Sequence, residues 1–358
     1  MVKKLKDILQ AFGPTRIIIF GFFLFLCFVA VQQNLNLPDL LSASMVRISM
    51  WGILVLAMLP AIRSGIGPNF GMSLGILCGL VGGLTALEMA YRVGDVRGLV
   101  EFSGGDLFII AILISIPFAI LTGVAYGWLL NRVKGSEMVI ATYVGFSMVS
   151  IMKIAWIYLP LTAPEMAWPI GRGVRVLVSL TGRDITRLLN DLASFQIGGV
   201  MVPTGLIAFF AVGCLLMWLF MRSKTGIAMY ASGDNPRFSV AAGINVDKNR
   251  IIGTTLSTLL GAVGILVYAQ SFGFMQLYEG PMYMPFVAVA AVLIGGATVK
   301  KASISHVIIG SCLFLGILVI AQPVANAVTS DWSNMGEISR KIIQNGVILY
   351  ALTQVGED

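Results

Sequence analysis

Charged residues are scarce in this sequence: Asp, Glu, Lys and Arg make up 11% of its 358 residues, whereas 57% are hydrophobic. Soluble domains carry about 25% charged residues, and a chain this poor in charge has too few polar side chains to cover a surface in water. The mean hydropathy of +0.90 leads to the same conclusion. The shortage of charge excludes an ordinary soluble domain and predicts an integral membrane protein.

Cysteine and histidine are also few, with four Cys and one His. Cys27, Cys78, Cys214 and Cys312 all lie within apolar runs, so we expect them to pack rather than form disulfides. His306 has no nearby cysteine or acidic cluster, so we expect no metal site. The sequence has no nucleophile elbow and no paired carboxylates, and GGATVKKAS has the wrong spacing for a phosphate-binding loop. We therefore expect that the chain is not an enzyme.

Long apolar stretches are what the sequence has in abundance. A membrane-spanning helix needs about 20 apolar residues, and ten candidate stretches alternate with short polar breaks. They cover residues 17–32, 46–62, 69–91, 107–130, 138–158, 201–221, 251–271, 284–298, 305–322 and 341–354. The pattern predicts an all-α polytopic membrane protein with one transmembrane domain over 1–358. The first stretch lacks a small-x-small cleavage site, so we expect a retained helix rather than a signal peptide.

Basic residues are distributed unevenly among the polar breaks. Placing the N-terminus in the cytoplasm puts every lysine except Lys153 and Lys341 on the cytoplasmic side. Cytoplasmic loops of membrane proteins carry an excess of Lys and Arg. We therefore expect both termini inside, and the net charge of +7 needs no nucleic-acid partner to explain it.

The stretch RSGIGPNFG, residues 63–71, interrupts an otherwise overlong apolar region. Gly65, Gly67 and Pro68 do not continue a helix readily. Irregular backbone at membrane depth is tolerated only where it is buried in protein or lines a cavity. Two interpretations remain open: a break close to a translocation pathway, or a tight cytoplasmic turn between two helices.

The longest charged stretch without a spanning apolar block is SKTGIAMYASGDNPRFSVAAGINVDKNR, residues 223–250. Asn235 followed by Pro236 predicts a helix N-cap and first helical position, and Gly243 predicts the C-terminal stop. These signals delimit a helix of about two turns.

One face of this short helix is expected to carry Phe238, Ala241 and Ala242, which are spaced by three and four residues. An aromatic side chain between small neighbours suits insertion into a groove of a partner protein. The alternative is that the segment is a solvated connector with one stray turn.

Three stretches of the sequence are informative together: the loop at 223–250, NRVKGSEMVIATYVG at 131–145 and FVAVAAVLIGGATVKKASISHVIIG at 286–310. They resemble the ribose, simple-sugar and branched-chain amino acid family of bacterial ABC importer permeases. Ser223 and Gly226 in S-x-x-G, followed by MYASGDN and AAGINV, are similar to the cytoplasmic loop of that family. NRVKGSEMVIATYVG and FVAVAAVLIGGATVKKASISHVIIG are similar to two further family stretches, in the expected order. The region SGIGPNFGMS departs from the GGIDLSVGS-like sequence of many sugar permeases and lacks its acidic residue.

The resemblance implies a type II-like ABC importer permease fold with about ten helices in the bacterial inner membrane. It implies that a cytoplasmic ATPase subunit, which binds ATP and Mg, receives the loop within 222–250. The coupling residues are then Gly226, Asp234, Asn235, Pro236, Arg237, Phe238, Ala241, Ala242 and Gly243. The other implied partners are a second permease copy or homologue, an extracytoplasmic substrate-binding protein and membrane lipid. We expect this chain to bind no cofactor of its own.

The expected solute is a small polar metabolite, with a simple sugar first and a nucleoside second. Asn69, Thr142 and Gln270 are the polar side chains that we predict along its pathway. The alternative is an ion-gradient-driven secondary transporter, which requires a role for Glu88 and Lys153, two charges within or beside apolar runs. Both residues can instead anchor helices at the outer membrane interface.

Residues 160–200 are expected to form an extracytoplasmic loop with an amphipathic helix at 182–196. In RDITRLLNDLASF, five apolar residues share one face: Ile185, Leu188, Leu189, Leu192 and Phe195. The helix either packs at the membrane interface or receives the substrate-binding protein. For the second interpretation, Arg172, Arg175 and Asp184 are the predicted electrostatic contacts.

Overall fold

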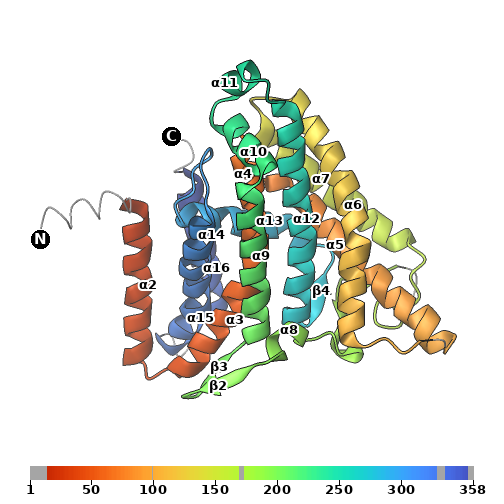
Figure 1. Cartoon of the computed structure of the whole chain (residues 1–358). Coiled ribbons are helices and arrows are strands. Elements are labelled where there is room, and N and C mark those ends of the chain that lie inside the picture. Colours follow the sequence, from red (N-terminus) through yellow and green to blue (C-terminus); the bar gives the residue numbers. More distant parts are fainter. Residues whose placement is uncertain (1–13, 99, 169–172, 329–334, 354–358) are drawn as a thin grey trace, which may run out of the picture.

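The structure is a computed structural model that describes residues 14–98, 100–168, 173–328 and 335–353. Its long helices run between two ends of the molecule (Figure 1). The helices are α2 (Pro14–Gln32), α3 (Leu37–Leu56), α4 (Met58–Arg63), α5 (Ser73–Met89), α6 (Gly104–Arg132), α7 (Glu137–Tyr158), α8 (Leu188–Asp191), α9 (Thr204–Arg222), α10 (Lys224–Asp234), α11 (Pro236–Ala241), α12 (Val246–Phe272), α13 (Gly280–Ile294), α14 (Ile304–Gly310), α15 (Gly316–Val328) and α16 (Met335–Thr353). Short 3-10 turns cover Phe70–Met72 (η1) and Thr181–Arg183 (η3), and π-helical turns cover Ala90–Val96 (η2) and Ser311–Leu315 (η4).

Strands are short and confined to the loops of the described chain. β1 (Leu177–Ser179) pairs antiparallel with β4 (Phe274–Gln276), so that Val178 lies opposite Met275. β2 (Phe195–Ile197) and β3 (Val200–Val202) form a hairpin at the end of the molecule opposite α11 (Figure 1).

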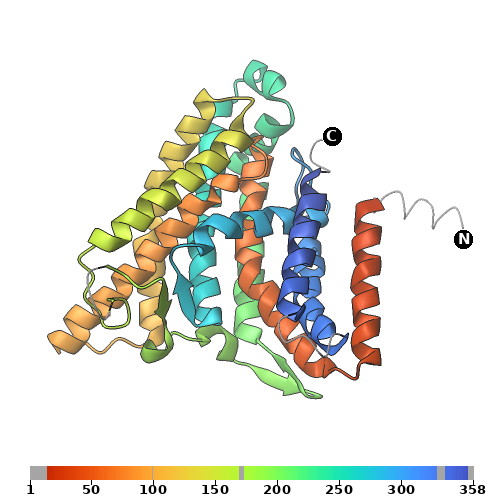
Figure 2. The same cartoon turned by 180° about the vertical axis from the view of Figure 1, so that it is seen from behind.

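Seven helical segments of the described chain are long and apolar enough to cross a membrane. They are Leu37–Arg63, Phe70–Val96, Gly104–Arg132, Glu137–Tyr158, Thr204–Arg222, Val246–Phe272 and Ile304–Val328. Ile17–Gln32 and Gly280–Ile294 are shorter apolar helices, and the second lies across the long helices (Figure 2). The expected mostly helical, multi-pass architecture is confirmed. The count of about ten spans and the orientation of both termini stay predictions.

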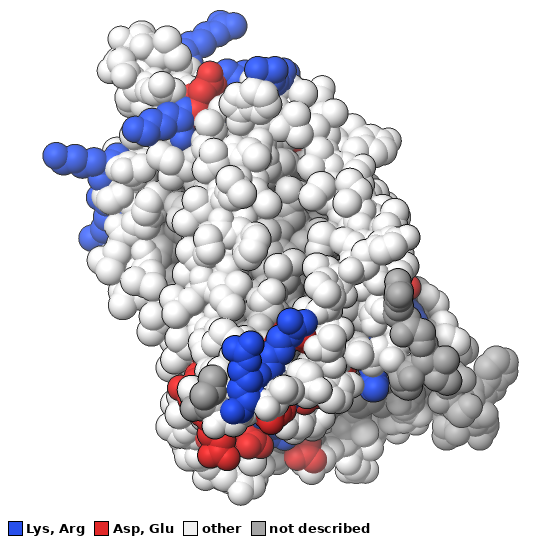
Figure 3. All heavy atoms as spheres, turned by 90° about the vertical axis from the view of Figure 1, so that its right-hand side faces the viewer, with Lys and Arg blue, Asp and Glu red and all other residues white. Residues whose placement is uncertain are grey.

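Charged side chains gather at the two ends of the molecule, with mostly uncharged residues between them (Figure 3). On the face drawn, Lys and Arg predominate at the end that carries α11, whereas most Asp and Glu lie at the opposite end. This distribution fits a chain whose middle lies in hydrocarbon.

Small residues bring α12 close to its neighbours in the centre of the bundle. A Cβ atom on Gly75 or Gly79 of α5 would strike the carbonyls of Thr258 or Ala262 of α12. Membrane helices associate through such small residues because these let backbones approach closely. The resulting tight packing makes α12 the central element to which α3, α5 and α6 attach.

Two helices begin at least six residues earlier than expected. α3 starts at Leu37 instead of residue 46, with Asn36 as N-cap and Pro38 in the first turn. Proline is favoured there because the first N–H groups of a helix have no partner within it. α16 starts at Met335 instead of residue 341. Both first turns carry polar residues, which an apolar-run criterion cannot detect.

The break at 63–71 is enclosed by protein. Gly65 and Gly67 adopt left-handed backbone, with φ of 78° and 90°, and every residue from 66 to 72 is buried. The segment connects the two candidate spans Leu37–Arg63 and Phe70–Val96. Its burial fits irregular backbone enclosed by protein, and both interpretations, a break close to a pathway and a tight turn between two helices, stay predictions.

The amphipathic helix expected at 182–196 is absent from these described residues. Only Leu188–Asp191 forms a helical turn, α8, and left-handed backbone at Asp184, Arg187 and Ala193 interrupts any longer helix. The reason is tertiary: the Arg187 N–H donates to the Gln270 carbonyl at 2.7 Å, and α8 packs against α9 and α12.

Candidate functional site

The end of the molecule that carries α11 contains the predicted coupling loop (Figure 1). α10 begins where Ser223 Oγ accepts a hydrogen bond from the Gly226 N–H at 3.2 Å. α11 begins at Pro236, and Asn235 Oδ1 accepts from the Phe238 N–H at 3.0 Å. Such side-chain caps satisfy N–H groups that have no partner within the helix.

The C-terminus of α11 is closed by backbone hydrogen bonds around Gly243. Gly243 has φ of 78°, and its N–H donates to the Val240 carbonyl at 3.0 Å. The Ile244 N–H donates to the Ser239 carbonyl at 2.9 Å. This pair of bonds is a Schellman motif, which needs a residue that tolerates left-handed backbone. The helix predicted between Asn235 and Gly243 is confirmed.

α11 projects from the bundle (Figure 1), and its residues other than Ser239 are exposed. Phe238 and Val240 are each 66% exposed. The other exposed residues of the predicted contact are Asp234, Asn235, Pro236, Arg237, Ala241, Ala242 and Gly243. Gly226 differs, because it is buried against the backbone of Phe220 and Met221. Gly226 allows α10 to pack closely against the end of α9, and it is not part of the exposed surface of α11.

A groove of about 690 Å³ separates α11 from the turn between α6 and α7. Lys134 on this turn pairs with Asp247 at the start of α12, Nζ to Oδ1 at 2.5 Å. Glu137 pairs with Arg250 at 2.5 Å, with side chains only 14% and 9% exposed. Sequence reasoning missed these pairs, since the partners stand 113 residues apart in each case.

α10 packs directly on the break at 63–71. A Cβ atom on Gly65 would lie 2.9 Å from Gly233 Cα, and one on Gly233 would strike the Arg63 carbonyl. The Arg63 guanidinium lies 4.5 Å from the ring centroid of Tyr230. The coupling loop and the broken span are therefore in backbone contact.

Asn69, near the C-terminal end of the break at 63–71, is fully buried, and both the nitrogen and the oxygen of its side-chain amide are hydrogen-bonded. Its Nδ2 donates to Ser257 Oγ of α12 at 2.8 Å, and its Oδ1 accepts from the Tyr126 hydroxyl of α6 at 2.9 Å. Gly71 leaves the space that the Tyr126 hydroxyl occupies. Asn69 thus ties the break to two other helices.

The three predicted pathway residues do not come together. The Thr142 hydroxyl donates to a carbonyl of its own helix, α7, at 2.9 Å. Gln270 Oε1 accepts from the Leu189 N–H at 3.1 Å, near the end of α12. Since a helix rises 1.5 Å per residue, Gln270 lies about 20 Å along α12 from Ser257, the partner of Asn69. A pathway role for all three stays a prediction.

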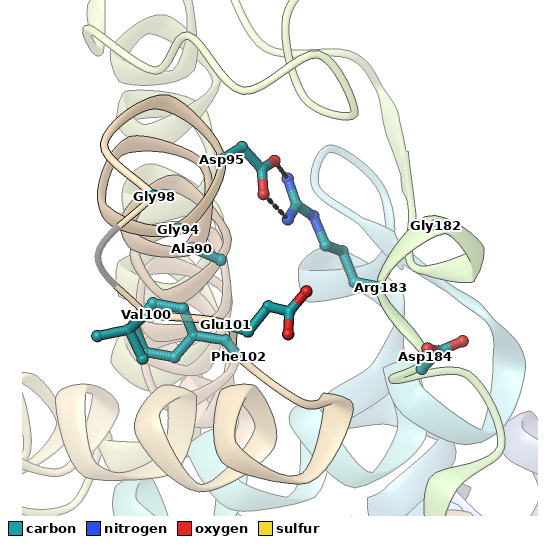
Figure 4. Close-up of a pocket in the computed structure, with 10 residues that line it drawn as sticks. All are labelled: Ala90, Gly94, Asp95, Gly98, Val100, Glu101, Phe102, Gly182, Arg183 and Asp184. Carbon is teal, nitrogen blue, oxygen red and sulfur yellow. Dashed lines mark hydrogen bonds and ion pairs between the residues drawn. The ribbon is translucent and has the colours of Figure 1, made fainter.

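The end opposite α11 holds a polar pocket of about 540 Å³, lined by Asp95, Glu101, Arg183 and Asp184 (Figure 4). The Arg183 guanidinium donates to both Asp95 oxygens, at 3.0 and 2.5 Å, and through Nε to Glu165 at 2.9 Å. These carboxylates, Asp95 foremost, raise the pKa of Arg183 above its usual value, so the guanidinium stays charged. The clamp joins η2 to the loop that follows α7.

The residues predicted to receive a binding protein have different surroundings. Asp184 lines this pocket with left-handed backbone, φ 53°. Arg175 is half-buried, and its Nε donates to the Ala167 carbonyl at 2.8 Å. Arg172 lies outside the described residues. Docking through these side chains stays a prediction.

Glu88 is engaged by neighbouring donors. It accepts from Arg92 Nε at 2.6 Å, from the N–H and hydroxyl of Thr162 at 2.8 and 2.7 Å, and from the Ala163 N–H at 2.9 Å. Lys153 lies on α7, half-buried. The contacts of Glu88 fit the interpretation that it anchors the end of the span Phe70–Val96, here to the loop that follows α7.

Curated relatives match parts of the chain. The fructose import permease protein FrcC of Rhizobium meliloti is 29% identical over 126 residues, which are 35% of this chain and 34% of that protein. The nucleoside ABC transporter permease protein NupC of Lactococcus lactis is 29% identical over 109 residues, 30% of this chain and 34% of that protein. The autoinducer 2 import system permease protein LsrC of Yersinia pseudotuberculosis is 26% identical over 172 residues, 47% of each. The matches thus span a third to a half of the relatives' length.

A solved structure, PsaBC from Streptococcus pneumoniae in complex with Fab, aligns with a TM-score of 0.41 at 15% identity, over 87% of this chain and 90% of that one. The family model described as "Branched-chain amino acid transport system / permease component" matches residues 40–351. The resemblance of the three sequence stretches is thereby confirmed, and the protein is a multi-pass protein of the inner membrane. The chain belongs to the branched-chain amino acid transport system permease component family of ABC-type permeases.

Proposed function

We propose that this chain is the membrane-spanning permease subunit of an ATP-binding cassette importer, and that α11 is its contact with a cytoplasmic ATPase subunit. The observation that carries the proposal is the form of α11. It is closed by caps at both ends, projects from the bundle, and leaves Phe238 and Val240 each 66% exposed. A rigid helix with an exposed aromatic side chain suits a partner's groove.

The proposed solute is a small polar molecule, a simple sugar first and a nucleoside second. Supporting this choice, the relatives named above are permeases for fructose, nucleosides and autoinducer 2. An ion-gradient-driven carrier is less favoured, since the Glu88 carboxylate is already engaged by four hydrogen bonds.

In the proposed assembly both termini and α11 face the cytoplasm. The predominance of Lys and Arg at the α11 end supports this orientation (Figure 3). An extracytoplasmic binding protein delivers the solute to the opposite end, and a second permease copy or homologue completes the membrane part. ATP and Mg bind the ATPase, so this subunit itself is not an enzyme.

In the proposed mechanism, closure of the ATPase subunits is transmitted to the membrane helices through contacts between backbones. Movement of α11 displaces α10, which packs on the break through Gly233 and Gly65. α10 is also tied to α12, since Asn249 Nδ2 donates to Ser232 Oγ at 3.0 Å and both residues are buried. Nucleotide then biases a two-state bundle, and the solute needs little affinity for the permease itself.

The experiment is co-reconstitution in vesicles with the ATPase that co-purifies with this chain. We expect vanadate-sensitive ATP hydrolysis and solute uptake that both require the chain and the ATPase. Uptake that continues without ATP and collapses with an ionophore would reject the proposal in favour of an ion-coupled carrier.

A further inference from the structure

A second crevice, of about 540 Å³, opens at the end of the molecule opposite α11, between α3, α8, α12 and α15. One wall is apolar and includes Phe272, Leu318 and Pro323. The polar lining consists of Arg47, Arg187, Asn190, Ser271, Gln322 and Asn326. Mixed lining of this kind, apolar with a few polar groups, is typical of small-molecule sites.

Arg47 lies within a candidate membrane span and lines this crevice. It is half-buried, and within the described ranges no carboxylate forms an ion pair with it. Charged residues within membrane spans are normally paired. A guanidinium without a carboxylate partner among the described residues is therefore available to contact an anion.

Buried polar atoms without partners cluster around the same crevice. Asn190 is only 4% exposed, and its Oδ1 has no hydrogen-bond partner among the described residues. The same holds for Ser271 Oγ, which also lines the crevice. An unsatisfied buried polar group costs about 1–3 kcal/mol, so two such groups in one crevice indicate that a polar ligand completes the site.

We propose that this crevice binds an oxyanion, a phosphate or carboxylate group carried on a partly apolar molecule, with Arg47 as its main contact. A guanidinium offers two parallel N–H donors that match the oxygens of such a group. The Ser271 hydroxyl and the amide N–H groups of Gln322 and Asn326 supply further donors, and Asn190 Oδ1 accepts from a hydroxyl or protonated oxygen of the same molecule. Arg187 stands at the exposed rim, where it pairs with Asp191 at 3.2 Å. The site is independent of the proposed transport function.

The oxyanion can come from a lipid headgroup or from a soluble molecule, and two probes distinguish them. The full chain, purified in detergent, is titrated with inorganic phosphate or with short-chain phosphatidylglycerol, against sodium chloride at equal ionic strength. We expect the melting temperature to rise with one of the two, because a ligand that binds only the folded state stabilises it. Stabilisation by phosphate assigns a soluble oxyanion, and stabilisation by phosphatidylglycerol alone assigns a lipid. No stabilisation by either beyond the chloride control overturns the proposal.

Variants test whether Arg47 makes the contact. Arg47→Gln is expected to raise the half-saturating concentration of the active probe at least about tenfold, through the lost charged hydrogen bonds. Arg132→Gln is the control. This arginine is exposed, stacks 3.9 Å above Trp128 and ends α6, a helix that does not line the crevice. The titration of this variant should match that of the wild type. An unchanged titration of Arg47→Gln overturns the proposal.

The ligand-free melting temperature separates a binding role from a structural one. Because no carboxylate pairs with Arg47 among the described residues, Arg47→Gln without anion should melt at or above the wild-type temperature. A lower melting temperature would make Arg47 a structural residue and contradict the assignment. Arg47→Lys, which keeps the charge but loses the two parallel donors, should also weaken anion binding and serves if the first variant fails to fold.

Discussion

Single polar residues inside the bundle hold helices together, and Asn69 is the example with the most consequence. Its amide donates to Ser257 and accepts from Tyr126, so one side chain joins the break at 63–71 to α12 and α6. At the surface, Phe238 has the opposite character, since it is held by a capped helix yet contacts little of its own chain. Asn69 thus stabilises the bundle, whereas Phe238 is available to a partner.

Replacing Asn69 by Ala should destabilise the protein. The variant leaves Ser257 Oγ buried without a partner and removes the acceptor of the Tyr126 hydroxyl, and an unsatisfied buried polar group costs about 1–3 kcal/mol. We expect a clear fall of the melting temperature in detergent. Thr142→Ala is the control, because that hydroxyl bonds only within its own helix, and its effect should stay within about 0.5 kcal/mol. Equal effects of the two substitutions would contradict the role of Asn69.

Replacing Phe238 by Asp should separate folding from coupling. An aromatic anchor in a partner groove contributes about 2 kcal/mol or more, which corresponds to about thirtyfold in affinity, and the carboxylate adds the cost of burying an unpaired charge. The exposed position should leave the melting temperature of the isolated chain unchanged. Phe238→Leu, which stays apolar, should retain most of the ATPase binding measured by co-purification. Wild-type binding and uptake by Phe238→Asp would return α11 to a solvated connector.

Among the elements, α10 is the one that connects the surface to the core. It meets the break where Gly233 and Gly65 leave no room for side chains, and its Ser232 accepts from Asn249 of α12. A comparison of two glycines with the same φ angle makes this contact testable. Gly65 and Gly243 both have φ of 78°, but a Cβ on Gly243 would meet no atom within 4 Å.

Alanine at these two glycines should have unequal effects. Gly243→Ala carries the left-handed strain alone, about 1 kcal/mol. Gly65→Ala carries the same strain and must also displace the backbone of α10, which adds about 2 kcal/mol. Melting temperatures of the two variants compare them directly. If both fall by the same amount, α10 and the break are not tightly packed.

At the scale of the whole molecule, the proposed orientation places the two charged ends on opposite sides of the membrane. Gly182→Cys introduces a thiol at an exposed turn where a Cβ meets no atom within 4 Å. Lys224→Cys does so at the exposed start of α10. In intact cells a membrane-impermeant maleimide should label position 182, whereas position 224 should react only after permeabilisation. The reverse pattern would invert the topology and remove α11 from the cytoplasm.

The sequence by itself determined the membrane class, the position of most helices and the form of α11. These features depend on apolar length, on the Asn235 cap and on Gly243, all of which act within a few residues of the chain. It could not determine what covers a given helix face: the segment at 182–196 has an amphipathic pattern, yet its backbone bonds to Gln270 instead of continuing as a helix.

Only the tertiary structure decided which polar groups meet. Asn69 finds partners 57 and 188 residues away, and Arg183 clamps Asp95 from 88 residues away. Arg47 and Ser271 line one crevice although they stand on different helices far apart in the sequence. Local patterns specify helices because their hydrogen bonds join residues four apart. Pairings between helices depend on how whole surfaces pack, and no short stretch of sequence contains that information.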